Sequence, residues 1–99
     1  MKAIVRPNNT GKTRELIEYS LQTGIPIYAY SDSKARSLRE KALAYFGASV
    51  NIVTSADLAS GASYGDILVD DMEKVFVKLL STYLPTADFN LVGFTATED

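Results

Sequence analysis

Gly11, Lys12 and Thr13 end the pattern G-x-x-x-x-G-K-S/T, in which a loop between a strand and a helix wraps around phosphate groups. Backbone N–H groups of such a loop converge on phosphate oxygens, the lysine adds a positive charge, and the hydroxyl binds Mg²⁺. The first glycine of the pattern is missing, because Arg6 stands at its position. Taken alone, the tripeptide is also explained as a common sequence that only begins a helix, so both interpretations stay open.

A second candidate cluster is the acidic pair of Asp70 and Asp71, which follows the apolar run Ile67-Leu68-Val69. A strand of this kind carries an aspartate to the edge of a sheet, where Asp70 would hold Mg²⁺ together with Thr13. Asp71 would orient an attacking water, although the longer glutamate is more usual in that role. The alternative is that either aspartate only caps a helix that begins near Met72.

A third candidate segment is Thr95-Ala96-Thr97, which follows an apolar run over residues 91–94. Two hydroxyl groups at the end of a strand are a third signal for a site. Taken alone, the segment is better explained as an ordinary C-terminal stretch of β-favouring threonines. Its weight therefore depends on its position relative to the other two segments.

The elements that must position these residues alternate between short apolar runs and longer helical patterns. We predict strands at residues 2–6, 25–30, 50–53, 67–69 and 91–94, helices at residues 11–23 and 72–83, and loops at residues 62–65 and 85–88. Another helix follows an N-cap at residues 31–33, buries Ala35, Leu38, Ala42, Tyr45 and Phe46, and ends at Gly47, as the first helix ends at Gly24. A short helix begins at Thr54, with Asp57 as its capping partner, and ends before Gly61.

Strands that are separated by helices pair in parallel through right-handed crossovers. We therefore predict an α/β fold with three layers (α/β/α) and a mostly parallel sheet of about five strands. The chain has 99 residues, 46% of them apolar, which is enough for a single domain over residues 1–99.

The composition also excludes several kinds of chemistry. The chain has no cysteine and no histidine, which removes disulfides, thiolate metal sites and the commonest general base. Its net charge of −2 is mixed along the sequence, so tight non-specific binding to nucleic acid is not expected. No apolar run approaches the roughly 20 residues of a membrane span, and no signal-peptide pattern begins the chain. We expect a soluble, cytoplasmic protein without membrane partners.

Taken in order, these segments resemble a minimal P-loop NTPase of the RecA-like kind, and within that group the first domain of superfamily-two helicases. The matching segments are Gly11-Lys12-Thr13, Ile52-Val53-Thr54-Ser55-Ala56-Asp57-Leu58, Asp70-Asp71-Met72-Glu73 and Thr95-Ala96-Thr97. They run over nearly the whole chain, although each motif is degenerate. Small free-standing phage proteins are similar in general shape. The resemblance implies a RecA-like topology, in which the last strand lies between the strand before the phosphate loop and the strand before the acidic pair.

The resemblance also implies a ligand and a set of roles. The ligand is ATP with Mg²⁺, and the reaction is attack of water on the γ-phosphoryl group. The nucleotide would bind to Asn9, Thr10, Gly11, Lys12, Thr13 and Arg14, and the metal to Thr13 and Asp70. The catalytic groups would be Lys12, Asp71 and Thr95, the last as a sensor near the γ-phosphate.

Members of this group bind ATP between two domains. Efficient hydrolysis by this chain would therefore need a second copy or a protein partner. Arg14, Arg36 or Arg39 could supply the arginine that acts across such an interface. The strand at residues 2–6 would form an open sheet edge that such a partner could cover. Nucleic acid would be reached only through such a complex. Two alternatives stay open. One is a non-catalytic interaction module, for example in phage or mobile-element DNA metabolism, and the other is a small kinase similar to thymidine kinases.

Overall fold

The structure is a computed structural model that describes residues 2–6, 10–59, 63–72 and 88–97. Several sequence predictions therefore lie partly or wholly outside the described residues. The helix expected at residues 72–83 is described only at Met72, and Asn9 of the expected phosphate loop is not described. The loop expected at residues 85–88 is described only at Asp88, which belongs to a strand instead.

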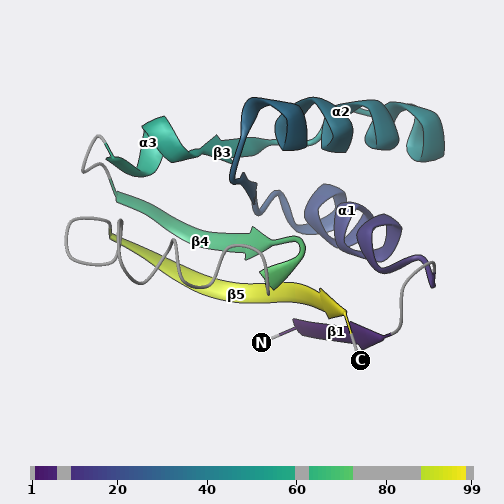
Figure 1. The fold of residues 1–99 in the computed structure, drawn as a ribbon, viewed down its shortest axis with the longest axis horizontal. Coiled ribbons are helices and arrows are strands. Elements are labelled where there is room, and N and C mark those ends of the chain that lie inside the picture. The colour runs from purple at the N-terminus through teal and green to yellow at the C-terminus, as the bar shows by residue number, and fades with distance from the viewer. Residues whose placement is uncertain (1, 7–9, 60–62, 73–87, 98–99) are drawn as a thin grey trace.

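The described elements form an α/β fold with a five-stranded sheet (Figure 1). In chain order they are β1 (Lys2–Arg6), α1 (Lys12–Thr23), β2 (Ile27–Ala29), α2 (Asp32–Phe46), β3 (Ile52–Thr54), α3 (Ser55–Ala59), β4 (Ser63–Val69) and β5 (Asp88–Thr97). The strand order is β1-β5-β4-β2-β3, and every neighbouring pair is parallel. The predicted α/β class is confirmed, and the sheet is entirely rather than mostly parallel.

Two apolar clusters lie on opposite faces of the sheet. Successive side chains of a strand point to opposite faces, so Leu68 belongs to one cluster while Ile67 and Val69 belong to the other. The first cluster contains the inward side chains of both longer helices: Leu16, Ile17, Ala35, Leu38 and Ala42. Helices α1 and α2 therefore cover the same face, side by side (Figure 1). The predicted layer of helices on the other face stays a prediction, because the helix expected at residues 72–83 lies outside the described residues beyond Met72.

Strand β4 is buried on both faces at its carboxyl end, as its unbroken apolar sequence predicts. Ile67, Leu68 and Val69 are all 0% exposed. The strand begins earlier than predicted, however, because residues 63–65 are part of it rather than of a loop. Gly65 adopts φ +65°, and the pairing register with β5 shifts between Ser63 and Gly65. From sequence alone, a glycine suggests that a strand is interrupted. Here Gly65 stays within β4 and lies at an irregular point in its hydrogen bonding with β5.

Several predicted helix boundaries are confirmed by their capping contacts. Gly24 and Gly47 end α1 and α2 in the left-handed conformation, and each donates its N–H to a carbonyl of the last helical turn. Ser31 is the N-cap of α2, where its hydroxyl accepts a hydrogen bond from the Lys34 amide at 3.0 Å. One prediction for this helix is wrong, because Tyr45 is 45% exposed instead of buried.

Helix α3 begins with the predicted reciprocal cap. The Asp57 amide donates to Thr54 Oγ1 at 3.2 Å, and the Thr54 amide donates to Asp57 Oδ2 at 2.8 Å. The Thr54 hydroxyl is thus used to begin a helix.

We expect Asp57→Ala to lower the free energy of unfolding by about 1 kcal/mol, because the Thr54 amide loses its acceptor. In a domain of this size that loss corresponds to a fall in Tm of about 4–8 °C, which thermal unfolding followed by circular dichroism can measure. Asp57→Asn keeps an acceptor oxygen and is the matched control. An equal loss in both variants would contradict a role for the cap.

Because the strands are parallel, their carboxyl ends all lie at the same end of the sheet. The register pairs Ile4 of β1 with Thr95 of β5, and Val69 of β4 with Phe94 of β5. The last strand therefore lies between β1 and β4, as expected from the sequence. Among the described strands, β1 pairs only with β5 and forms the predicted sheet edge. None of the helices in the described part of the chain has the length and apolar character needed to cross a membrane.

Candidate functional site

The turn that begins α1 is built around Gly11. This residue is the N-cap, with φ 79°, a left-handed conformation that side chains disfavour, and no described side chain forms a capping hydrogen bond there. No atom lies within 4 Å of the position that a Cβ would take, so backbone conformation rather than space favours glycine here. The amides of the first helical turn have no partner within a helix, so a helix that begins in this way presents N–H groups to an anion.

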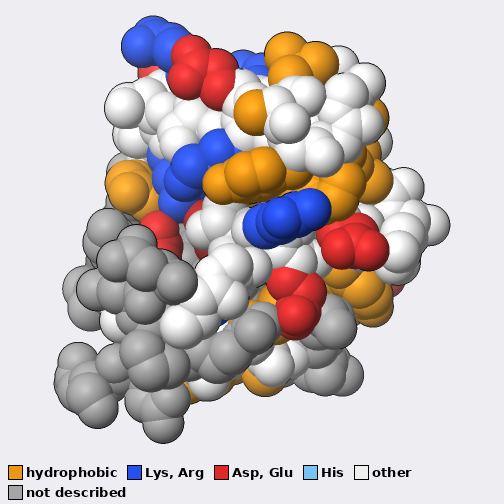
Figure 2. Space-filling model, turned by 90° about the vertical axis from the view of Figure 1, so that its right-hand side faces the viewer, with side chains coloured by type: hydrophobic (Ala, Val, Ile, Leu, Met, Phe, Trp, Pro, Cys, Tyr) orange, Lys and Arg blue, Asp and Glu red, His pale blue; other side chains and the backbone are white. Residues whose placement is uncertain are grey.

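A hollow of about 240 Å³ lies against this turn. Its lining consists of Thr10, Gly11, Lys12, Thr13, Arg14, Lys41, Tyr45 and Asp71. Three of these side chains are cationic and one is a carboxylate, so the hollow is suited to an anion. Figure 2 shows the face at this side of the molecule, where Lys and Arg side chains lie beside apolar ones. Lys12 is the first residue of α1 and is only 7% exposed.

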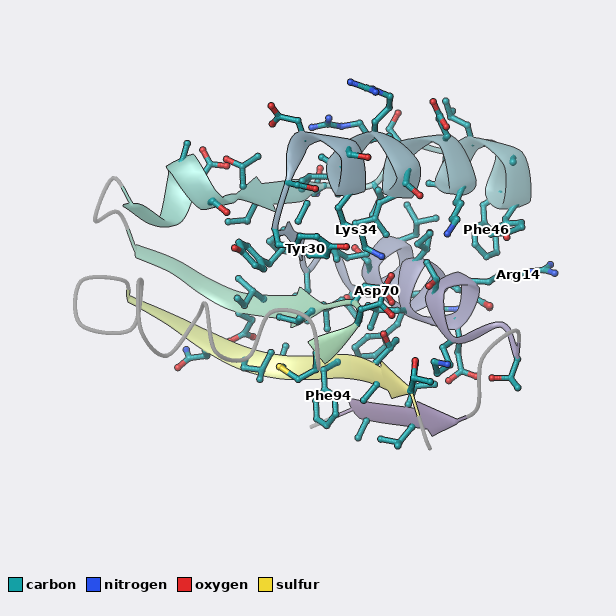
Figure 3. The ribbon with its side chains drawn as sticks, viewed as in Figure 1. Arg14, Tyr30, Lys34, Phe46, Asp70 and Phe94 are labelled. Carbon is teal, nitrogen blue, oxygen red and sulfur yellow. The ribbon has the colours of Figure 1, made fainter. Side chains whose placement is uncertain are left out.

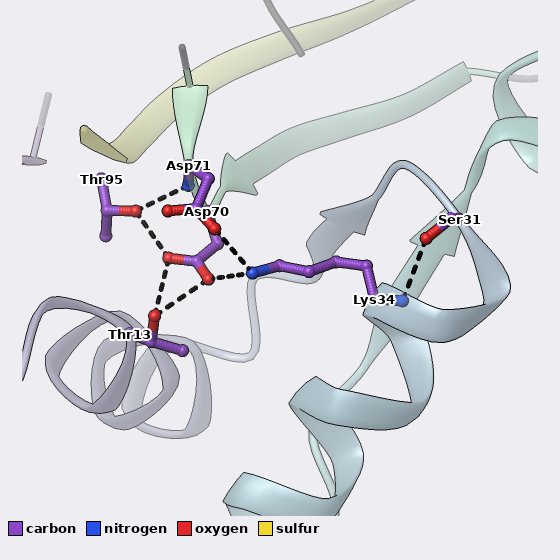
Figure 4. Close-up of polar contacts among 6 residues, drawn as sticks. All are labelled: Thr13, Ser31, Lys34, Asp70, Asp71 and Thr95. Atoms are coloured by element: carbon purple, nitrogen blue, oxygen red, sulfur yellow. Dashed lines mark hydrogen bonds and ion pairs between the residues drawn. The ribbon is translucent and has the colours of Figure 1, made fainter. Parts of the chain in front are cut away.

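Asp70 is the centre of a buried hydrogen-bond cluster at the end of β4 (Figure 4). It is 1% exposed, and its two carboxylate oxygens accept hydrogen bonds from Thr13 Oγ1 at 3.2 and 3.0 Å. Thr95 Oγ1, which is 0% exposed, donates to Asp70 Oδ1 at 2.5 Å. Residues from α1, β4 and β5 thus meet at one carboxylate, as the parallel register requires.

Asp71 continues the chain in a strained conformation. Its φ of 58° is left-handed, a region that aspartate enters more readily than most residues but still at a cost. Its amide donates to Thr95 Oγ1 at 2.8 Å, so the Thr95 hydroxyl joins the two aspartates. Strained backbone conformations are often found at functional sites. Asp71, directly after a buried strand, is therefore a candidate functional position.

Lys34 completes the cluster, and it was not identified from the sequence. Its ammonium lies 2.6 Å from Asp70 Oδ2 and 2.9 Å from Asp71 Oδ2, and its side chain is 10% exposed. Figure 3 shows it extending from α2 toward Asp70. Burial would lower the pKa of this ammonium, but the two carboxylates outweigh burial, so the pKa of Lys34 is raised above its ordinary value. Lys34 is therefore a fixed positive charge at neutral pH.

One sequence signal could have pointed to Lys34. It lies in the first turn of α2, three residues after the Ser31 N-cap. The positive end of the helix dipole disfavours a cation there, so a lysine at this place suggests carboxylates nearby.

A comparison of the chain with known protein families, curated proteins and solved structures found no significant match. The resemblance described from the sequence therefore remains a proposal, and the case for a function depends on the residues themselves.

The structure brings most of the expected site residues together. Thr13, Asp70 and Thr95 are in direct contact, and Asp71 is joined to them through Thr95 and Lys34. Thr10, Gly11, Lys12 and Arg14 line the adjoining hollow. The exposed Arg36 and Arg39 lie on α2 and are not among the residues lining that hollow.

Arg14 contacts the aromatic end of α2. Its guanidinium carbon lies 5.3 Å from the ring centre of Tyr45 and 5.7 Å from that of Phe46, within the range of cation–π attraction. The two rings meet edge to face, with 6.2 Å between their centres. Tyr45 thus packs beside Arg14 at the rim of the hollow instead of in the core.

The cluster can be tested against the expected Mg²⁺. A hydroxyl and a carboxylate are suitable ligands, and Mg²⁺ binds such oxygens at about 2.0–2.1 Å with octahedral geometry. The Lys34 ammonium, however, already lies 2.6 Å from the Asp70 oxygen that the metal would share with Thr13. In this arrangement the residues do not fit Mg²⁺.

Proposed function

We propose that this chain binds the polyphosphate of a nucleoside triphosphate in the hollow beside Gly11–Thr13, and that ATP is the nucleotide. The observation that carries the proposal is the joining of Thr13, Asp70 and Thr95 next to a glycine-capped helix start. These residues come from three separate segments and share one edge of a parallel sheet, where ligands of such folds commonly bind. A common tripeptide that only begins a helix would not account for that convergence.

The proposal includes the finer fold, a three-layer α/β/α domain of the P-loop NTPase type with RecA-like topology. Its support is the strand order, in which β5 lies between β1 and β4. A second support is that the two apolar clusters bury both faces of the sheet, as a sheet between two layers requires.

The proposed roles follow from position. The first-turn amides of α1 and the Lys12 ammonium hold the phosphates, and Thr10 and Arg14 line the entrance. Thr13 and Asp70 would hold Mg²⁺ only in an arrangement in which Lys34 has left Asp70. Efficient hydrolysis is proposed only with a second copy or a protein partner, because the resembled group completes its site across an interface.

One observation favours the alternative of a non-catalytic interaction module. Asp71, the residue expected to orient water, forms an ion pair with Lys34 at 2.9 Å. A carboxylate held in this way is a weaker partner for water. The alternative keeps the fold, binds nucleotide weakly or not at all, and assigns the biological role to a protein contact.

The test is a titration of the chain with an ATP analogue that carries a fluorophore on its ribose. We expect saturable binding that Lys12→Ala weakens by about 10- to 100-fold, since a charge-assisted hydrogen bond contributes about 1.5–3 kcal/mol. Arg36→Ala removes an exposed charge outside the hollow and should bind as the wild type does. If the wild type shows no saturable binding at millimolar nucleotide, the proposal is wrong. If both variants lose the same affinity, the binding reflects general charge attraction and not a specific site.

A further inference from the structure

The Lys34 ammonium contacts the same Asp70 oxygen that accepts a hydrogen bond from Thr13. Asp70 Oδ2 accepts from the Thr13 hydroxyl at 3.0 Å and contacts the ammonium at 2.6 Å. The same ammonium reaches Asp71 Oδ2 at 2.9 Å. It thus bridges the two carboxylates and offsets one of their two negative charges, which weakens their attraction for a metal ion.

The surroundings hold the ammonium in this place. Ser31 fixes the first turn of α2, from which Lys34 projects, through the 3.0 Å bond to the Lys34 amide. Asp70 is fixed from the other side by Thr13 and by the buried Thr95 hydroxyl. Since Lys34 and Asp70 are 10% and 0% exposed at their side chains, water competes little for either partner.

The charges around the hollow remain favourable to an anion without a metal. Lys12, Arg14 and Lys41 line it with positive charge, and its single carboxylate, Asp71, is paired with Lys34. Mg²⁺ ordinarily screens the repulsion between carboxylates and the phosphate groups of a nucleotide. Here the Lys34 ammonium supplies part of that screening, since it offsets one of the two carboxylate charges.

We propose that Lys34 is a resident cation that takes the place of Mg²⁺ at Asp70, so that this chain binds the polyphosphate of a nucleotide without a divalent metal. The inference rests on the proposed nucleotide site. Lys34 is a positioning residue in this scheme, since it acts on the ligand through Asp70 and Asp71.

The deciding experiment compares binding of the fluorescent ATP analogue to wild type in millimolar Mg²⁺ and in EDTA. We expect dissociation constants that agree within about threefold. Binding that is more than about tenfold weaker in EDTA would overturn the inference and leave the proposed function intact. Absence of binding in both buffers would remove the proposed function, and this inference with it.

A second measurement uses Mn²⁺ without nucleotide, followed by paramagnetic broadening of the backbone NMR signals of Thr13 and Asp70. We expect no saturable broadening in wild type at millimolar Mn²⁺, because the ammonium excludes the ion. Saturable broadening at these residues would contradict the inference whatever the variants do.

Lys34→Met opens the cation position and should reverse both results. We expect Mn²⁺ to bind at least about tenfold more tightly than to wild type, and nucleotide binding to become dependent on Mg²⁺. Glu40→Met removes a charge from the exposed face of the same helix and should keep wild-type behaviour. Lys34→Met that folds but gains neither property would count against the inference. If this variant does not fold, the two wild-type measurements decide the question.

Discussion

Lys34→Met is expected to lower the free energy of unfolding by about 3–5 kcal/mol, the usual cost of removing one partner from a buried ion pair. Asp70, at 1% exposure, would be left with only the Thr13 and Thr95 hydroxyls as partners. Asp71 would add a second negative charge without the ammonium between them. Urea unfolding followed by circular dichroism measures the loss. Arg39→Met on the exposed face of α2 should change stability by no more than about 0.5 kcal/mol.

A double variant separates the ion pair from simple packing. Adding Asp70→Asn to Lys34→Met removes the uncompensated charge, so we expect at least half of the lost stability to return. Met retains most of the length of the lysine side chain, which limits any cavity. A double variant no more stable than Lys34→Met would show that an uncompensated charge on Asp70 is not the cause of the loss.

Much of the fold could be predicted because local signals agreed with the global pattern. The unbroken run at residues 67–69 predicts a strand covered on both faces, and all three side chains are fully buried. Gly24 and Gly47 end the two longer helices because the left-handed cap favours glycine. Where a local signal had two meanings, the prediction was wrong, as for Gly65, which lies within β4. Tyr45 was assigned to the core from helical periodicity alone, but it is 45% exposed and packs beside Arg14.

The candidate site also contains residues that could be predicted from the sequence and one that was not. Thr13, Asp70 and Thr95 each follow a recognisable segment, and parallel pairing brings the ends of those segments together. Lys34 belongs to no motif, since its importance comes from β2 lying next to β4 in the sheet. Only that neighbour relation, which a single sequence does not contain, brings the start of α2 within reach of the end of β4.

The resident lysine also connects stability with function. A site that keeps two carboxylates adjacent needs a cation in every state of the protein, bound or free. A metal ion would satisfy that need only while bound, whereas Lys34 satisfies it permanently. The ion pair with Lys34 can therefore keep the turn at Asp71 ordered without a ligand. The same ion pair makes the Asp71 carboxylate less available to act on water.

Thr95→Val is expected to lower the free energy of unfolding by about 2–4 kcal/mol, although it hardly changes the volume of the side chain. The Thr95 hydroxyl donates to Asp70 Oδ1 and accepts from the Asp71 amide, so valine leaves both groups without this partner in a buried place. Thr95→Ser keeps the hydroxyl and loses one methyl group, which should cost only about 1 kcal/mol.

The two variants distinguish a polar role for Thr95 from a packing role. Urea unfolding of both gives their difference, and binding of the fluorescent ATP analogue follows the effect on the site. Because the turn at Asp71 has φ 58° and borders the hollow, loss of its hydrogen bond should weaken binding in Thr95→Val more than in Thr95→Ser. If serine costs as much as valine, the methyl group matters more than the hydroxyl, and the bridge between Asp70 and Asp71 does not hold the site together.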